Sequence, residues 1–101
     1  MIKIWIDDIR TPPSEGWVWI KSVEAAKEYI TMASLYNIAD IFLSVDHDAG
    51  EYYQYGGDYI RLLDWLEETG RSYPIRIHSQ NPVGVQNMRA IIQRNGWKEI
   101  R

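Results

Sequence analysis

Short apolar segments that alternate with amphipathic segments constrain the fold of this chain more than any other feature of its sequence. In residues 2–6, isoleucines alternate with a lysine and a tryptophan, which is the period of a half-buried strand. Residues 41–45 form a continuous apolar run of the kind found in strands buried within a parallel sheet. Shorter strands are predicted at 17–20, 74–77 and 97–101.

Three helices are predicted between the strands, and each begins at a recognisable capping residue. Ser22 and Asp58 are the predicted N-caps of the first two helices, and Asn81 followed by Pro82 is the start signal of the third. The residues that stop these helices are Asn37, Gly70 and Gly96. The segment 11–16 contains two prolines and a glycine, so a loop is predicted between the first two strands.

This alternation predicts an α/β fold with right-handed crossovers between the strands. We expect a three-layer, open, largely parallel sheet with helices covering both faces. A chain of 101 residues is long enough for one such domain and too short for two, so residues 1–101 are assigned to a single domain. The hydrophobic fraction of 46% and the charged fraction of 25% are those of a folded globular chain.

Composition also excludes several classes of function. The chain has no cysteine, which excludes disulfides, thiolate metal sites and a cysteine nucleophile and favours a cytoplasmic location. The sequence shows no signal peptide and no apolar stretch long enough to cross a membrane. The formal net charge of −3 argues against binding along an extended nucleic-acid backbone, so a phosphorylated ligand is expected to be small or bridged by a metal. The sequence gives no indication of the oligomeric state.

Polar residues gather where the predicted strands end. They are Asp7 and Asp8 after the first strand, Asp46, His47 and Asp48 after the third, and His78 and Ser79 after the fourth. In an open parallel sheet, ligands bind outside the carboxyl ends of the strands, at the point where the strand order reverses. The sequence therefore predicts a functional site at this edge of the sheet.

Several carboxylates at one edge repel one another unless a cation neutralises them. Oxygen ligands of this kind suit Mg²⁺ or Mn²⁺, so we predict a metal site at the strand ends. Its predicted ligands are Asp7, Asp8, Asp46 and Asp48. The same ion can bridge to a phosphate and activate a water molecule.

Other residues near these acids have the chemistry to bind phosphate and to move protons. Ser79 and the helix that starts at Asn81 offer hydrogen-bond donors to phosphate oxygens, and Arg10 can pair with the phosphate charge. An unperturbed imidazole has a pKa near neutrality, so His47 and His78 are each a candidate acid or base. A histidine at a strand end is also often a purely structural hydrogen-bonding group, and this alternative stays open for both.

The tyrosine-rich segment 50–57 is predicted to be a loop. The favoured interpretation is an exposed loop whose tyrosines pack on the surface. The alternative is a mobile lid that stacks on a nucleobase.

The order of these polar groups resembles that of response-regulator receiver domains. In that resemblance Asp7 and Asp8 match the metal-binding acids, Asp46 the phosphoacceptor and Ser79 the hydroxyl residue. The chain more closely resembles the cyclic-phosphate-processing receiver-like domains. The motifs that carry this likeness are Ile-Trp-Ile-Asp-Asp-x-Arg at 4–10, Gly-Trp at 16–17, Val-Asp-His-Asp-x-Gly at 45–50 and His-Ser-x-Asn-Pro-x-Gly at 78–84.

The resemblance implies a flavodoxin-like receiver fold with a degenerate first helix and a role in processing cyclic phosphates, at RNA ends or in nucleotides. The leading hypothesis is a metal-dependent phosphoesterase in which His47, His78 and Asp46 are catalytic and Ser79, Asn81 and Arg10 bind phosphate. One alternative is a stand-alone receiver that is phosphorylated on Asp46 and regulates a protein partner. Another is a non-catalytic adaptor that binds a nucleotide or a protein through the tyrosine-rich segment.

Overall fold

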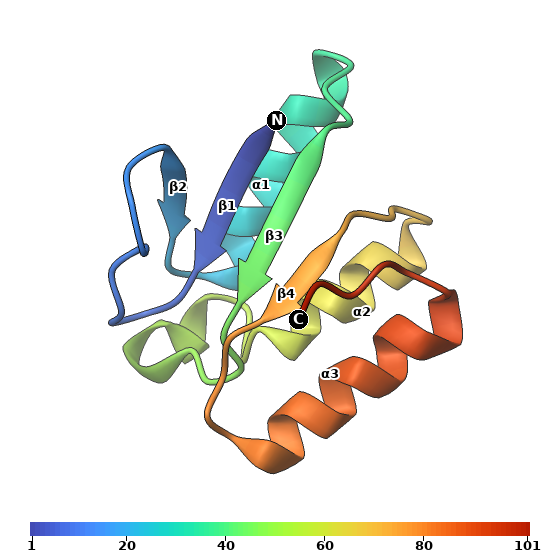
Figure 1. Cartoon of the computed structure of the whole chain (residues 1–101). Helices are drawn as coiled ribbons and strands as arrows, with labels where there is room; N and C mark the ends of the chain where they lie inside the picture. The colour runs from blue at the N-terminus through green and yellow to red at the C-terminus, as the bar shows by residue number, and fades with distance from the viewer.

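A computed structural model describes residues 1–101 and shows strands and helices in the predicted alternation (Figure 1). The strands are β1 (Ile2–Ile6), β2 (Trp17–Ile20), β3 (Ile41–Val45) and β4 (Ile75–Ile77). The helices are α1 (Val23–Leu35), the 3₁₀ helix η1 (Gly50–Tyr55), α2 (Ile60–Glu68) and α3 (Pro82–Asn95). None of the helices has the length and apolar character needed to cross a membrane.

The four strands form one parallel sheet in the order β2-β1-β3-β4. The strand order reverses between β1 and β3, so the loops that follow these two strands diverge there. The predicted last strand is reduced to a single parallel bridge between Ile75 and Glu99 at the outer edge of β4. Two backbone hydrogen bonds hold it, one from Ile75 N–H to Lys98 O at 2.9 Å and one from Ile100 N–H to Ile75 O at 2.8 Å.

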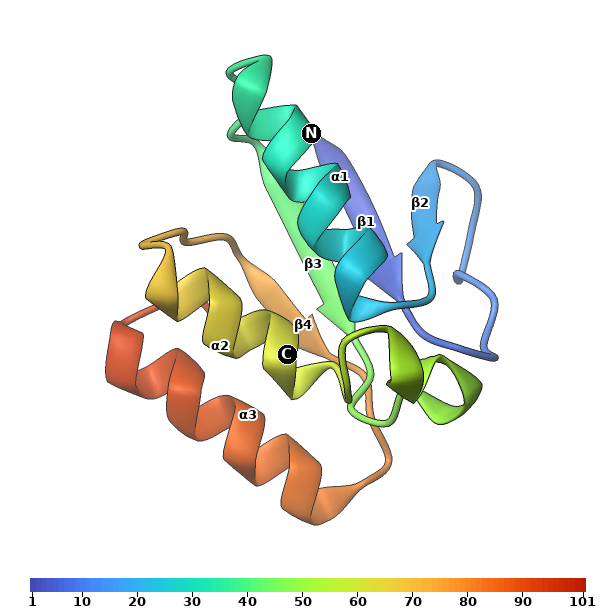
Figure 2. The same cartoon turned by 180° about the vertical axis from the view of Figure 1, so that it is seen from behind.

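The predicted α/β class, the parallel sheet and the receiver-like fold are confirmed, but the helices gather on one face. α1 and α2 cross the face of the sheet that is turned to the viewer in Figure 2, and α3 packs against α2. No helix crosses the opposite face, which is turned to the viewer in Figure 1. The structure therefore has two layers where three were expected. The reason is local, because a proline-containing loop and not a helix joins β1 to β2.

Alternation along the strands decides which side chains enter the core. In β1 the side chains of Ile4 and Ile6 are fully buried toward the helices, as are Leu43 and Val45 in β3. They belong to one hydrophobic cluster of 20 buried residues that extends into all three α-helices. Fully burying an aliphatic side chain contributes about 1.5–3 kcal/mol, so this cluster fixes the strand ends relative to one another.

Two of the three predicted helix caps are confirmed. The Ser22 side chain accepts a hydrogen bond from Ala25 N–H at 3.1 Å, and Asn81 Oδ1 accepts one from Gly84 N–H at 3.0 Å. Both bonds satisfy amide groups that the first helical turn leaves free.

The prediction that Asp58 caps α2 is wrong. Tyr59 occupies the N-cap position and supplies no side-chain cap. Tyr59 is fully buried, and its N–H donates to His47 O at 2.9 Å, which draws the start of α2 toward the end of β3. Asp58 Oδ1 consequently accepts a hydrogen bond from Ala49 N–H at 3.0 Å and closes the turn after β3.

The tyrosine-rich segment is more ordered than the predicted loop, because residues 50–55 form η1. Tyr53 and Tyr55 are exposed there, as the surface interpretation expects, whereas Tyr52 packs against the core.

Candidate active site

Three carboxylates from two neighbouring strand ends meet at the predicted edge of the sheet. Asp7 and Asp8 follow β1, and Asp46 follows β3. Oxygen atoms of all three lie within 4.8 Å of one another. Asp7 is 1% exposed and Asp46 is 7% exposed. We call these three residues the acid cluster.

Asp7 is held by hydrogen bonds to both of its carboxylate oxygens. Oδ1 accepts from the backbone N–H groups of Ile9 and Arg10 at 3.0 and 2.9 Å. Oδ2 accepts from Nε2 of His78 at 2.9 Å. Burial raises the pKa of Asp7, but these hydrogen bonds together outweigh burial and lower the pKa overall. Asp7 is therefore ionised at neutral pH.

Asp8 is the member of the acid cluster whose ionised form is disfavoured by its surroundings. Burial and the neighbouring charges of Asp7 and Asp46 raise the pKa of Asp8. The backbone at Gly50 also lies close to the Asp8 carboxylate, because a Cβ atom at Gly50 would collide with Asp8 Oδ2. Gly50 adopts a φ of +54°, so the turn after β3 needs glycine for conformation as well as for space.

The acid cluster fits a hard divalent cation. Its donors are all carboxylate oxygens, which Mg²⁺ and Mn²⁺ prefer. A cation would also remove the repulsion that raises the pKa of Asp8. Of the predicted metal ligands, the structure brings Asp7, Asp8 and Asp46 together, whereas Asp48 lies in a second group with His47 and Asp58.

His78 supports Asp7 and has no free ring nitrogen. Its Nε2 contacts Asp7 Oδ2, and its Nδ1 lies 2.9 Å from Ser44 Oγ. The imidazole also stacks on the Trp5 indole, with ring centroids 3.8 Å apart and planes at 4°. Its carbonyl oxygen accepts a hydrogen bond from Arg10 Nη1 at 2.9 Å.

These contacts also fix the protonation of His78. Because Asp7 is ionised, Nε2 must carry the proton that it donates to the carboxylate. Burial lowers the pKa of His78 and outweighs the opposing effect of Asp7, so the ring is neutral at pH 7. The Ser44 hydroxyl then donates to Nδ1.

His47 has one ring nitrogen free. Its Nδ1 lies 2.9 Å from Asp48 Oδ1 and 3.4 Å from Asn81 Nδ2, whereas Nε2 makes no hydrogen bond. The ring packs against the first turn of α3, where a Cβ atom at Gly84 would lie 2.5 Å from His47 Cγ. Of the two histidines, His47 is therefore the one able to exchange a proton with a ligand.

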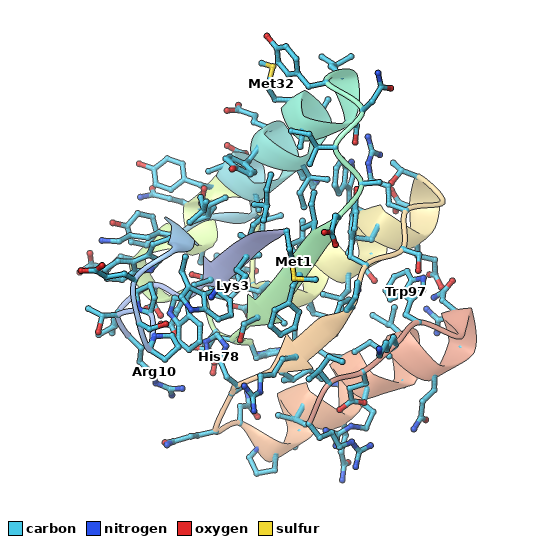
Figure 3. The ribbon with its side chains drawn as sticks, turned by 45° about the horizontal axis from the view of Figure 1, so that its top comes forward. Met1, Lys3, Arg10, Met32, His78 and Trp97 are labelled. Atoms are coloured by element: carbon cyan, nitrogen blue, oxygen red, sulfur yellow. The ribbon has the colours of Figure 1, made fainter.

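The predicted phosphate-binding residues lie beside His47 and His78. Ser79 Oγ accepts from Asn81 N–H at 3.1 Å, which leaves its hydroxyl proton available to a ligand. The Asn81 side chain caps α3 through Oδ1, and its Nδ2 is 3.5 Å from each carboxylate oxygen of Asp48. The Arg10 guanidinium lies at the carbonyl of His78 (Figure 3).

Sequence reasoning missed the residues that orient these groups. Ser44 and Trp5 hold the ring of His78, and Gly84 admits the ring of His47. Ser44 did give a signal, since it is the one polar residue in the apolar run 41–45. Trp5 gave none, because its pairing with His78 joins positions that are far apart in the chain.

The fold and the site together define a class of protein, a receiver-like α/β domain with an acid cluster and two histidines at the carboxyl edge of its sheet. Residues 2–94 match the family model of the cyclic-phosphate processing receiver domain. The chain belongs to this family. A comparison with curated proteins and one with solved structures return no match to the chain.

Proposed function

We propose that this protein is a metal-dependent phosphoesterase that opens a cyclic phosphate to a monoester. One observation carries the proposal: in an acid cluster suited to Mg²⁺ or Mn²⁺, Asp46 accepts a hydrogen bond from the backbone N–H of His47, a histidine with a free ring nitrogen. The family's link to cyclic-phosphate processing supplies the substrate class. A nucleoside 2′,3′-cyclic phosphate is the first substrate to test, as a free nucleotide or at an RNA end.

In this proposal Asp7, Asp8 and Asp46 hold the cation. A bound Mg²⁺ or Mn²⁺ supplies Lewis-acid chemistry, which neutralises phosphate charge and lowers the pKa of water. His78 donates to Asp7 Oδ2 and orients that carboxylate, so it acts through Asp7. Asp46 Oδ1 accepts from His47 N–H at 2.8 Å, which couples the metal ligand to the neighbouring histidine.

His47 moves the proton. Asp48 accepts the Nδ1 proton of His47, which leaves Nε2 as the basic nitrogen. Nε2 takes a proton from the attacking water, whose oxygen bonds to phosphorus as one P–O bond of the ring breaks. The same nitrogen then returns that proton to the departing ribose oxygen. Ser79, Asn81 and Arg10 supply donors to the phosphate oxygens that do not react.

The test is a turnover assay on nucleoside 2′,3′-cyclic phosphates with and without Mg²⁺ or Mn²⁺, with monoester products resolved by phosphorus NMR. We expect turnover only with metal. His47→Gln should lower the rate by about 10²–10⁴, the usual contribution of general acid–base catalysis. Asp46→Asn should abolish metal-dependent turnover, and Asp64→Asn on α2 is the matched control. If none of the cyclic phosphates is consumed in the presence of metal, the proposal is wrong.

One observation favours a second candidate function, a receiver that is phosphorylated on Asp46. Asp46 Oδ1 accepts from His47 N–H, but no hydrogen bond engages Oδ2, so this oxygen is available as an acceptor. Stable labelling by acetyl phosphate with Mg²⁺, lost in Asp46→Asn and accompanied by no turnover of cyclic phosphates, would identify this function. Labelling that is absent while cyclic phosphates are consumed supports the esterase.

A further inference from the structure

The face of the sheet without helices has a distinct composition. Strand register and alternation place seven strand residues on it: Lys3, Trp5, Trp17, Trp19, Phe42, Ser44 and Arg76. We call this surface the open face (Figure 1). Four of the seven residues are aromatic, two are cationic and none is acidic.

The aromatic rings form one continuous surface over three strands. Trp17 of β2 contacts the edge of Trp5 in β1, with ring centroids 5.6 Å apart and planes at 77°. Trp17 also lies 5.7 Å from Phe42 of β3, with planes at 50°. These rings are all half-buried. Each keeps part of its surface accessible because no helix covers this face.

The charge of the open face is opposite to that of the whole chain. Lys3 Nζ lies 5.0 Å from the centroid of the Trp17 ring. Lys21, which directly follows β2 and borders the open face, has its Nζ 4.5 Å from the centroid of the Trp19 ring. Arg76 adds a further exposed cation in β4. The chain as a whole has a formal net charge of −3. A face with cations between aromatic rings and no strand carboxylates therefore selects an anionic ligand with flat rings.

The open face runs directly into the candidate active site. Trp5 stacks on His78, and His78 binds Asp7 of the acid cluster. The Trp19 indole N–H donates to Asp7 O at 2.8 Å, so a second ring of the face touches the same residue. Figure 3 shows Lys3, His78 and Arg10 in one region of the molecule. None of the three surface pockets is lined by residues of the acid cluster.

We propose that the open face binds the last few nucleotides of a single-stranded RNA whose 3′-terminal phosphate lies at the acid cluster. Bases stack on aromatic side chains without sequence preference, and a sheet face with exposed aromatic residues is a common platform for two or three bases. Lys3 and Arg76 pair with backbone phosphates. The placement of the terminal phosphate rests on the proposed function. The binding of the RNA chain to the open face does not.

The test measures binding of pentauridylate with a free 3′-hydroxyl in metal-free buffer, followed by tryptophan fluorescence and by calorimetry. This probe reports on the open face alone, because it has no terminal phosphate. We expect it to bind at least about fivefold more tightly than uridine monophosphate, since each stacked base contributes roughly a fivefold to a hundredfold gain. Trp17→Ala should lose about fivefold or more of that affinity.

Two charge-reversal variants test the same inference without the tryptophan substitution, whose effect on folding would complicate the result. Lys3→Glu on the open face should lower pentauridylate affinity severalfold and reduce the salt dependence by about one phosphate contact. Arg61→Glu on α2, on the helical side, makes the same change in net charge and is the matched control. It should alter affinity by less than about twofold at moderate salt.

Three outcomes would overturn the inference. The first is pentauridylate binding no tighter than the mononucleotide. The second is equal effects of Lys3→Glu and Arg61→Glu. The third is a stable dimer in sedimentation that Lys3→Glu dissociates, which would make a second copy of this chain the occupant. A protein that binds pentauridylate through Lys3 but leaves cyclic phosphates intact would contradict the proposed function and keep the RNA-binding face.

Discussion

At the scale of single residues, hydrogen-bond partners separate the roles of two histidines that look alike in the sequence. Both rings follow a strand and both touch an aspartate. His78 uses its second nitrogen to accept from Ser44 and is covered by Trp5, so it has no atom left for a ligand. His47 keeps Nε2 free. This difference leaves His47 as the histidine with a ring nitrogen available to a ligand, whereas His78 is engaged in holding Asp7.

Asp8→Asn removes one charge from the acid cluster. Because burial and the charges of Asp7 and Asp46 raise the pKa of Asp8, its ionised form destabilises the metal-free fold. Two unit charges 4 Å apart repel by about 1 kcal/mol in water and about 4 kcal/mol near a protein surface. We therefore expect Asp8→Asn to raise the free energy of unfolding at pH 7 by at least about 1 kcal/mol, measured by urea denaturation in metal-free buffer.

The stability gained by Asp8→Asn should increase with pH. A carboxyl with a raised pKa in the folded state binds its proton more tightly there than in the unfolded chain, so stability falls as pH rises through that window. The advantage of Asp8→Asn should be small below about pH 3.9 and full above the raised pKa. Asp64→Asn on α2 is the control. Equal stability of Asp8→Asn and the unaltered protein at pH 7 would rule out like-charge repulsion.

The residues of the acid cluster could be predicted because strand ends are visible in the sequence and parallel strands share one edge. Asp7, Asp8 and Asp46 follow clear apolar segments, so their convergence needed only the strand order. Asp48 was assigned to the same site because it is close in sequence. In the structure Asp48 instead bonds to the ring of His47, a choice set by the path of the turn after β3.

At the scale of elements, Gly84 decides how closely α3 approaches β3. An alanine normally stabilises a helix by about 1 kcal/mol relative to glycine. At Gly84, however, an added Cβ would lie 2.5 Å from Cγ of His47, so the ring or the helix must move. We expect Gly84→Ala to destabilise the protein by about 1–3 kcal/mol despite the helical gain, as overpacked cores do.

The control for Gly84→Ala is the same change in a background without the ring. In His47→Ala the added methyl group meets no imidazole, so Gly84→Ala should become neutral or stabilising when measured by urea denaturation. A similar loss of stability in both backgrounds would show that contact with His47 is not the cause.

The C-terminal segment depends on an ion pair because it has only one β-bridge. Arg89 of α3 donates from Nε at 2.9 Å and from Nη2 at 2.7 Å to Glu99, whose side chain is 11% exposed. These hydrogen bonds lower the pKa of Glu99. We expect Glu99→Gln to cost about 1–2 kcal/mol of unfolding free energy at pH 7.

For a carboxyl with a lowered pKa, the stabilisation is present above its unfolded pKa and is lost as pH falls through the folded value. The difference between Glu99→Gln and the unaltered protein should therefore shrink below about pH 4.3. Glu68→Gln, at an exposed position of α2, is the matched control. A difference that stays constant from pH 7 to pH 3 would contradict an electrostatic origin.

Element boundaries were predictable where the capping residue acts locally, and not where a buried side chain overrides it. Ser22 and Asn81 cap their helices through bonds within four residues. Asp58 is an equally good cap by composition, but the burial of Tyr59 and its bond to His47 O place Asp58 against the turn after β3. Such a contact depends on the assembled core, which sequence pattern does not reveal.

At the scale of the whole molecule, the loop that joins β1 to β2 without a helix leaves two layers where three were expected. The segment between β1 and β2 was correctly predicted to be a loop, and without a helix there no layer covers the opposite face of the sheet. Helices that follow right-handed crossovers in one direction along a sheet all lie on the same face. With strands β2, β1, β3 and β4 in that order, α1, α2 and α3 therefore share a face, and the opposite face keeps its aromatic surface open.

Cation binding should stabilise the entire fold, because the acid cluster joins β1 to β3 at the centre of the sheet. A ligand that binds only the folded state at 100 times its Kd adds about 2.7 kcal/mol. For a domain near 100 residues this raises Tm by roughly 10 °C or more. We expect such a rise with Mg²⁺ or Mn²⁺ in thermal unfolding, and none in Asp46→Asn. Potassium chloride at equal ionic strength is the control, and an equal rise with that salt would mean that the carboxylates meet without forming a metal site.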